Sequence, residues 1–405
     1  MRISWALVAL VALAGCDAAA DPLDAGASVD AGARPDAGPA RDAGGPPEDL
    51  DGFVEWQMEY GGIPGAALAI VTADDVELHT YGFAEIEEDR PVDAHTLFIM
   101  ASVSKLFAAT RAMQLVEAGR LDLDAPIGDA LGYTVEHPDH PGTAITTRML
   151  TTHTSGLEDS FATLATAISE GDPTMTLDEF TRAYALEGGA LYDDSLWGPP
   201  PGTERSYCNA CFGVLGAVLE GAGGDTLRAQ SEEALFAPLA LDGAGWLLAD
   251  VDASRLAMPY GYNGRSYRPL GHQGVAFYPA TSLRISVTGL SRFMQMILRR
   301  GELDGVRVLP EARVDELLTI QDPSVSRRQA IGFSERTLDG TRFIGHSGST
   351  DGASNELLIA REGGYGLVVI TNSDAYFRAR VPSLQQGEEA IDAIIARLNS
   401  RAMSR

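Results

Sequence analysis

The chain has 405 residues, of which 45% are apolar and 7% aromatic, so it can bury a sizeable core and is neither wholly disordered nor fibrous. Its 57 acidic and 30 basic side chains give a formal net charge of −27, which would repel a polyanion and argues against nucleic acid as a partner. Only one of the basic residues is a lysine, Lys105, and the other 29 are arginines. Because the other basic positions are all arginine, the single lysine suggests that the amine of Lys105 has a chemical role.

Residues 1–15 are typical of an export signal, because Arg2 precedes an apolar run that is too short to span a membrane. The run ends in Leu13-Ala14-Gly15-Cys16, which resembles the bacterial lipobox and implies lipidation of Cys16; an ordinary secretory signal is the alternative. Residues 16–47 repeat Asp-Ala-Gly and hold few aliphatic side chains, so they predict a disordered acidic tether. We therefore expect a cell-envelope lipoprotein on the periplasmic side of the inner or outer membrane.

Residues 48–405 are expected to form one folded domain with strands near both of its ends. In chain order the patterns predict a helix from Leu50 to Met58, strands at 66–71 and 76–81, helices at 106–118, 290–298 and 311–318, strands at 343–344, 356–359 and 366–371, and a last helix after Pro382. Strands at both ends around a mainly helical middle, roughly 103–320, predict an α/β (α+β) fold. In this fold one antiparallel sheet is formed by the two chain ends, and a helical lobe is inserted between them.

Ser102 and Lys105 are three residues apart where a helix is expected to begin, so the amine of Lys105 can reach the hydroxyl of Ser102. At a helix N-terminus the backbone N–H of Ser102 could stabilise an oxyanion. Arginine could not replace Lys105, because a guanidinium keeps its proton whereas a desolvated lysine can exchange one. The Ser-x-x-Lys spacing is common by chance, and it gains weight only from the motifs that follow it.

Three further motifs offer polar groups that such a serine could use. The turn Thr152-His153-Thr154-Ser155-Gly156 is rich in hydroxyl groups, and Tyr207-Cys208-Asn209 offers a phenol that could take a proton and an amide that could hold substrate or Lys105. His346-Ser347-Gly348 ends a predicted strand and leads into Ser349, whose N–H could be a second oxyanion donor. Each motif alone would usually be structural.

In this order, Ser102-Val103-Ser104-Lys105 and the three later motifs resemble the serine β-lactamase and penicillin-binding-protein-like superfamily. The likeness covers about residues 53–400 and is closest to the branch with class C β-lactamases, DD-carboxypeptidases, D-aminopeptidases and family VIII esterases. It implies a β-lactamase/transpeptidase-like fold and a reaction through an acyl-enzyme. By this resemblance Ser102 would be the nucleophile, Lys105 and Tyr207 the proton-transfer pair, Asn209, His346 and Gly348 substrate-binding residues, and the amides of Ser102 and Ser349 the oxyanion hole.

One departure from the family pattern bears on the substrate. Class C β-lactamases and DD-peptidases carry Lys-Thr-Gly where this chain has His346-Ser347-Gly348. A histidine with an ordinary pKa of about 6.5 is mostly neutral at pH 7 and holds a carboxylate less strongly than lysine does. We therefore expect an ester or amide hydrolase of the esterase or D-amino-acid amidase type. The alternatives are a β-lactamase or DD-carboxypeptidase, and, from another class, a tethered non-catalytic protein that binds cell-wall peptides.

The other cysteines and histidines leave several possibilities open. Cys208 and Cys211 could be two small buried thiols, which we rank first, or a disulfide of an exported chain, or, last, a redox-active pair. His137 and His140 lie in a proline-rich loop without a third ligand, so we expect surface residues and no metal site. No phosphate-binding or dinucleotide-binding glycine loop follows a predicted strand, so no cofactor is expected. The expected partners are a small ester, amide or peptide substrate and, through Cys16, a membrane.

Overall fold

The computed structural model describes residues 45–241 and 243–405. The predicted export signal, Cys16 and nearly all of the tether lie outside these residues.

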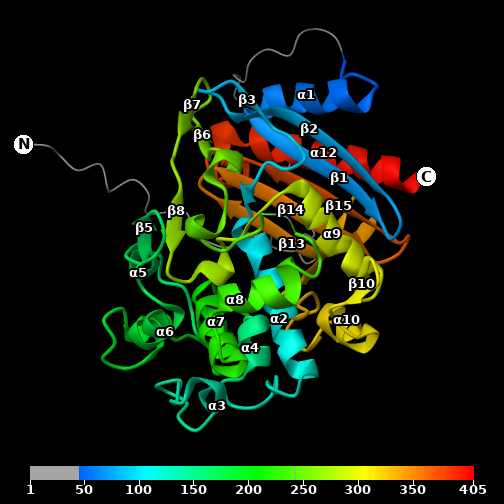
Figure 1. The fold of residues 1–405 in the computed structure, drawn as a ribbon. Coiled ribbons are helices and arrows are strands. Elements are labelled where there is room, and N and C mark those ends of the chain that lie inside the picture. Colours follow the sequence, from blue (N-terminus) through cyan, green and yellow to red (C-terminus); the bar gives the residue numbers. More distant parts are fainter. Residues whose placement is uncertain (1–44, 242) are drawn as a thin grey trace, which may run out of the picture.

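The largest element is a seven-stranded antiparallel sheet in the order β12-β13-β14-β15-β1-β2-β3 (Figure 1). Its strands are β1 Gly65–Thr72, β2 Val76–Glu85, β3 Arg90–Pro91, β12 Ser334–Leu338, β13 Thr341–Thr350, β14 Ala353–Ala360 and β15 Tyr365–Thr371. In the centre β1 pairs with β15, with Ala66 opposite Thr371. The prediction of one antiparallel sheet formed by both chain ends is confirmed.

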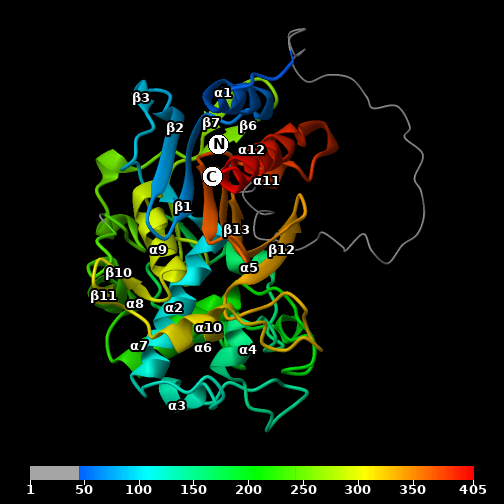
Figure 2. The ribbon, with the colours of Figure 1, turned by 90° about the vertical axis from the view of Figure 1, so that its right-hand side faces the viewer.

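Helices cover both faces of this sheet, because successive buried side chains of a strand point to opposite sides. Leu68 and Ile70 of β1 pack with α1 (Leu50–Gly61) and α12 (Gln386–Met403) in a cluster that we call the outer core. Ala69 and Val71 belong to the inner core, a larger cluster that runs through α9 (Val287–Leu298) and α2 (Ser104–Glu117) into the helical lobe. Figures 1 and 2 show α1 and α12 on one side of the sheet and the lobe on the other.

The lobe lies between β3 and β12 in the sequence. Besides α2 and α9, its helices are α3 Gly128–Leu131, α4 Thr147–Thr151, α5 Phe161–Ala165, α6 Leu177–Ala185, α7 Ala210–Gly223, α8 Leu227–Ser231 and α10 Glu311–Leu318. Four short antiparallel pairs complete it, namely β4 Phe98–Ile99 with β9 Arg284–Ile285, β5 Ile168–Glu170 with β8 Gln273–Val275, β6 Tyr260–Tyr262 with β7 Tyr267–Pro269, and β10 Glu302–Leu303 with β11 Val306–Arg307. A short helix, α11 Ala375–Arg378, follows β15.

The ends of the predicted elements agree with local signals. In α1 the Asp49 side chain accepts a hydrogen bond from Gly52 N at 2.8 Å, and Gly62, with φ +57°, ends the helix. The strand expected at 343–344 is confirmed, but it extends over ten residues as β13. The sequence did not predict β12, because this edge strand has no fully buried residue from which an apolar pattern could be read. Within the described residues, no helix is both long and apolar enough to cross a membrane.

Candidate active site

Ser102 lies in a strained turn between the sheet side of the molecule and the lobe. A single 3-10 turn, Ala101–Val103, leads directly into α2, so the predicted start of a helix at Ser102 holds. Ala101 has φ +48°, a left-handed conformation that an alanine adopts only where its surroundings impose it. Met100, the residue before this turn, is anchored by a backbone hydrogen bond in which its N–H donates to Leu283 O at 2.8 Å. Ser102 itself remains partly exposed, so a substrate can approach its hydroxyl.

Lys105 is completely buried, and three oxygen atoms surround its amine. Its Nζ lies 3.0 Å from Ser102 Oγ, 2.8 Å from Asn209 Oδ1 and 2.9 Å from Ala280 O. The two carbonyl oxygens can only accept hydrogen bonds, whereas a hydroxyl can accept or donate one. Of these three oxygen atoms, the Ser102 hydroxyl is the one that can give the amine a proton.

Tyr207 and Asn209 flank the same amine from the N-terminal end of α7. Tyr207 Oη donates to Ser102 Oγ at 2.8 Å, and its ring centroid lies 5.0 Å from Lys105 Nζ. Asn209 is buried and immediately precedes α7. The structure thus brings together Ser102, Lys105, Tyr207 and Asn209, as the sequence motifs predict.

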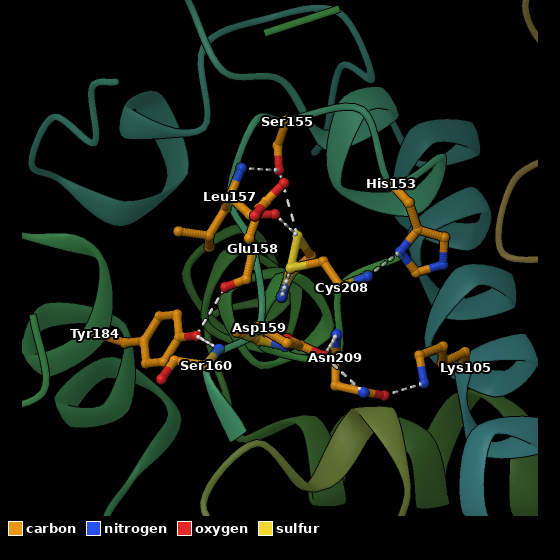
Figure 3. Close-up of a disulfide and its surroundings, with 12 residues drawn as sticks. Lys105, His153, Ser155, Leu157, Glu158, Asp159, Ser160, Tyr184, Cys208 and Asn209 are labelled. Atoms are coloured by element: carbon orange, nitrogen blue, oxygen red, sulfur yellow. Dashed lines mark hydrogen bonds between the residues drawn. A yellow bond between two sulfur atoms is a disulfide. The ribbon is translucent and has the colours of Figure 1, made fainter. Parts of the chain in front are cut away.

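A residue that the sequence analysis missed, Asp159, fixes the orientation of Asn209. One carboxylate oxygen accepts from Asn209 N and Nδ2, both at 2.8 Å, and the other accepts from Ala210 N at 2.9 Å (Figure 3). Because Nδ2 is directed to Asp159, Oδ1 is directed to Lys105. Burial raises the pKa of Asp159, while the three N–H donors and Lys105 act in the opposite direction. The signal that could have found Asp159 is its place just after the Ser155-Gly156 turn.

His153, in the same turn, contacts the segment that carries Tyr207 and Cys208. Its Nδ1 accepts from Cys208 N at 3.1 Å (Figure 3). Its ring centroid lies 4.4 Å from that of Tyr207. Burial, followed by electrostatic interactions with Arg205, Lys105 and His346, holds its pKa well below the ordinary 6.5. His153 is therefore a neutral hydrogen-bond acceptor, and among the described residues its Nε2 has no hydrogen-bond partner.

Cys208 and Cys211 form a disulfide, so our first-ranked expectation of two buried thiols was wrong. Both residues are fully buried, and Cys211 Sγ lies 3.3 Å from Ser155 Oγ and 3.6 Å from Leu157 O (Figure 3). The bond joins the residue after Tyr207 to the first turn of α7, where i and i+3 positions come close together. It ties together the segment that carries Tyr207 and Asn209.

His346, Gly348 and Ser349 lie within β13, not at the end of a strand as predicted, because β13 pairs with β14 as far as Thr350 opposite Ala353. His346 is half-buried, its ring centroid lies 6.1 Å from that of Tyr207, and its Nδ1 is 2.5 Å from Ser347 O. A Cβ added to Gly348 would lie 2.3 Å from Met100 O. Only glycine therefore allows β13 to pass this close to the turn that carries the serine.

One of the two histidines in the proline-rich loop, His137, differs from the expected surface position. His137 is buried rather than on the surface, its Nε2 donates to Gly198 O at 3.1 Å, and its Nδ1 accepts from Asp139 N. A ring contact with Trp197 at 5.2 Å explains the burial. In the part of the chain that the structure describes, no group of three or more His, Cys, Asp or Glu residues could hold a metal ion.

Comparison with known proteins agrees with this geometry. The family model described as Beta-lactamase matches residues 50–387. The chain is 29% identical over 323 residues to penicillin-binding protein 4 of Amycolatopsis lactamdurans. The matched region covers 76% of this chain and 81% of that protein. It is 26% identical over 334 residues to D-aminopeptidase of Cereibacter sphaeroides, covering 80% of this chain and only 60% of the length of that enzyme.

Solved structures show the same fold at low sequence identity. An octameric penicillin-binding protein homologue from Pyrococcus abyssi has a TM-score of 0.67 and 22% identity, covering 84% of this chain and 77% of the other. A D-amino acid amidase from Ochrobactrum anthropi SV3 has a TM-score of 0.64 and 21% identity, covering 87% and 100%. With the family model matched over most of its length, the chain belongs to the beta-lactamase family, a family of serine hydrolases.

Proposed function

We propose that this protein hydrolyses an ester or amide through an acyl-enzyme on Ser102, with Lys105 and Tyr207 as the proton-transfer pair. The observation that carries the proposal is the position of Ser102 Oγ, 3.0 Å from Lys105 Nζ and 2.8 Å from Tyr207 Oη. A nucleophile within hydrogen-bonding distance of its base, with the base held by a third group, is the arrangement that such catalysis needs.

The surroundings of Lys105 explain how it can act as a base. In its neutral form the amine has two N–H groups and one lone pair. When Asn209 Oδ1 and Ala280 O accept these two N–H groups, the lone pair can face the hydroxyl proton of Ser102, 3.0 Å away between the heavy atoms.

The reaction then has two halves. Ser102 Oγ attacks the carbonyl carbon, its proton moves to Lys105, and the carbonyl oxygen becomes an oxyanion that the amides of Ser102 and Ser349 stabilise. The leaving group takes a proton by way of Tyr207 and departs. Water attacks the acyl-enzyme in the second half, with the same pair removing its proton, and Ser102 is regenerated.

For the substrate we propose an ester or an amide of the D-amino-acid type. D-aminopeptidase and D-amino acid amidase are among the similar proteins, and His346 stands where the β-lactamases of the resemblance carry lysine. The second candidate is a β-lactam or cell-wall peptide, which similarity to penicillin-binding protein 4 favours. Turnover of p-nitrophenyl acetate, D-alanyl p-nitroanilide and nitrocefin distinguishes the two candidates. Faster turnover of nitrocefin than of the other two compounds would rank the β-lactam above the ester or amide.

A fluorophosphonate probe tests the nucleophile directly. We expect the full chain to be labelled, Ser102→Ala to lose the label, and Ser324→Ala, which removes an exposed hydroxyl, to keep it. An unlabelled wild-type chain would instead favour a protein that binds cell-wall peptides without turning them over.

We also propose that the enzyme is a lipoprotein of the cell envelope, attached through Cys16 by way of the 16–47 tether. The lipobox-like sequence and the acidic repeats support this proposal. In a bacterial host we expect the full chain in the membrane fraction and Cys16→Ser in the soluble fraction. Equal partitioning of the two would contradict it.

A further inference from the structure

Arg205 lies beside the candidate site, and a buried glutamine holds its side chain. Gln329, in the loop between α10 and β12, is only 3% exposed, and its Nε2 donates to Ala330 O at 2.9 Å and Phe333 O at 3.0 Å. These two bonds fix the amide, so that its Oε1 accepts from Arg205 Nε at 2.8 Å. The guanidinium is thus placed before any substrate arrives, which lowers the entropic cost of binding.

This guanidinium is next to the reacting groups. Arg205 Cζ lies 5.9 Å from the ring centroid of Tyr207, whose hydroxyl donates to Ser102 Oγ. The ring of His346 lies 6.1 Å from the same tyrosine ring. Arg205 and Tyr207 are both only partly buried, so a substrate bonded to Ser102 can reach them.

We propose that Arg205 selects substrates that carry a carboxylate, by supplying a fixed positive charge beside Ser102 and Tyr207. This inference rests on the proposed acyl transfer at Ser102 and deepens it, because it adds a charged group to the ester or amide substrate. A guanidinium is always charged and can bind a carboxylate through two parallel N–H groups. A local cation is also needed in a chain of net charge −27, which would otherwise repel an anionic substrate.

A pair of esters that differ in charge tests the proposal on the full chain. The neutral ester is p-nitrophenyl acetate, and the anionic one is the mono-p-nitrophenyl ester of glutaric acid. We expect Arg205→Gln to lower kcat/KM for the anionic ester by about 10–100-fold, mainly through KM, which is the size of a lost charged hydrogen bond. The neutral ester should change by less than about 3-fold, as for a substitution that leaves the reacting groups in place.

Two further variants separate charge from structure. Arg205→Lys keeps the charge but loses the paired N–H groups, so it should fall between wild type and Arg205→Gln. Arg265→Gln removes the same charge from an exposed turn between β6 and β7 and should leave both esters unchanged. Equal losses on both esters would overturn the proposal, because Arg205 would then act by supporting Tyr207, and an unchanged anionic ester would overturn it as well.

Failure of the proposed function would be visible separately. If the wild-type chain hydrolyses neither ester and the fluorophosphonate probe does not label Ser102, the assignment of Ser102 fails, and binding still decides the role of Arg205. Calorimetric titration with monomethyl glutarate should then give a Kd at least about 10-fold weaker for Arg205→Gln than for wild type. An equal Kd for the two chains would overturn the proposal.

Discussion

At the scale of single residues, the orientation of one amide decides whether Lys105 can serve Ser102. Asn209 offers Oδ1 to Lys105 only because Asp159 binds its Nδ2, and the same carboxylate also accepts from two backbone N–H groups. Asp159 makes its hydrogen bonds to Asn209 and Ala210 and not to Ser102, the proposed nucleophile, so we propose that it is a positioning residue that acts through Asn209.

Replacing Asp159 by asparagine tests this role. Asparagine has one acceptor oxygen for the N–H groups of Asn209 and Ala210 that now share two, so one buried donor is left unsatisfied and the amide of Asn209 can turn. We expect kcat for p-nitrophenyl acetate to fall about 10–100-fold with little change in KM, and the free energy of unfolding to fall by about 1–3 kcal/mol.

A double-mutant cycle distinguishes positioning from a purely structural effect. If Asp159 acts through Asn209, then Asp159→Asn combined with Asn209→Ala should be no slower than Asn209→Ala alone. Losses that multiply would contradict the role. Asp193→Asn, which alters an exposed carboxylate bonded to Ser195 N, serves as the matched control and should leave kcat unchanged.

His153 gives a prediction on pH. Its pKa is held below 6.5 in the folded state, chiefly by burial, so below pH 6.5 the unfolded chain binds a proton that the folded chain does not. Stability therefore rises with pH in this window and is lost as pH falls below 6.5, by up to about 1.4 kcal/mol per pH unit. His153→Asn should remove this part of the slope, because asparagine tolerates φ +60° and can still accept from Cys208 N. Urea titrations of both chains at pH 5 to 7 measure the difference, and parallel slopes would contradict the prediction.

At the scale of elements, the site depends on how closely β13 passes the turn before α2. A Cβ at position 348 would meet the backbone atom Met100 O at 2.3 Å and the side-chain atom Ala101 Cβ at 3.3 Å, and both atoms belong to the two residues that precede Ser102. We expect Gly348→Ala to lower kcat/KM by at least about 100-fold, because displacements of about 1 Å at a reacting group cost this much. Gly261→Ala in β6, where the added Cβ has its nearest neighbour at 3.5 Å, should retain activity. Full activity of Gly348→Ala would contradict the argument.

Elements with strong local signals could be predicted from the sequence. Three such predictions are confirmed: the helix α1 that ends at a glycine, the hairpin of β1 and β2, and the contact between Ser102 and Lys105. Each of them depends on residues that are close together in the chain. The hydrogen bond from Asn209 to Asp159 and the one from Arg205 to Gln329 could not be predicted, because each joins segments 50 or more residues apart. The length of β13 also escaped prediction, since its polar end is fixed by pairing with β14 rather than by its own pattern.

At the scale of the whole molecule, the site is built from both the sheet and the lobe. Lys105 and Tyr207 come from the lobe, and His346 and Gly348 come from β13, so the residues of the proposed site stay close to one another only while the two parts are packed together. The inner core makes this packing continuous, because it runs without a break from the sheet face, through α2 and α9, to α7. A core shared in this way predicts that the sheet and the lobe unfold in one step.

Urea unfolding followed by three probes tests this expectation. Tryptophan fluorescence, far-UV circular dichroism and residual ester hydrolysis should give the same midpoint. Leu215→Ala, in the inner core on α7, and Ile394→Ala, in the outer core on α12, both remove a buried side chain and should each cost about 2–5 kcal/mol. Each should shift all three midpoints together, although only Leu215 lies on the helix that follows Asn209. If Leu215→Ala moved the activity midpoint and left circular dichroism in place, the lobe would be unfolding alone, and the sheet would not be what holds Ser102 and its partners in register.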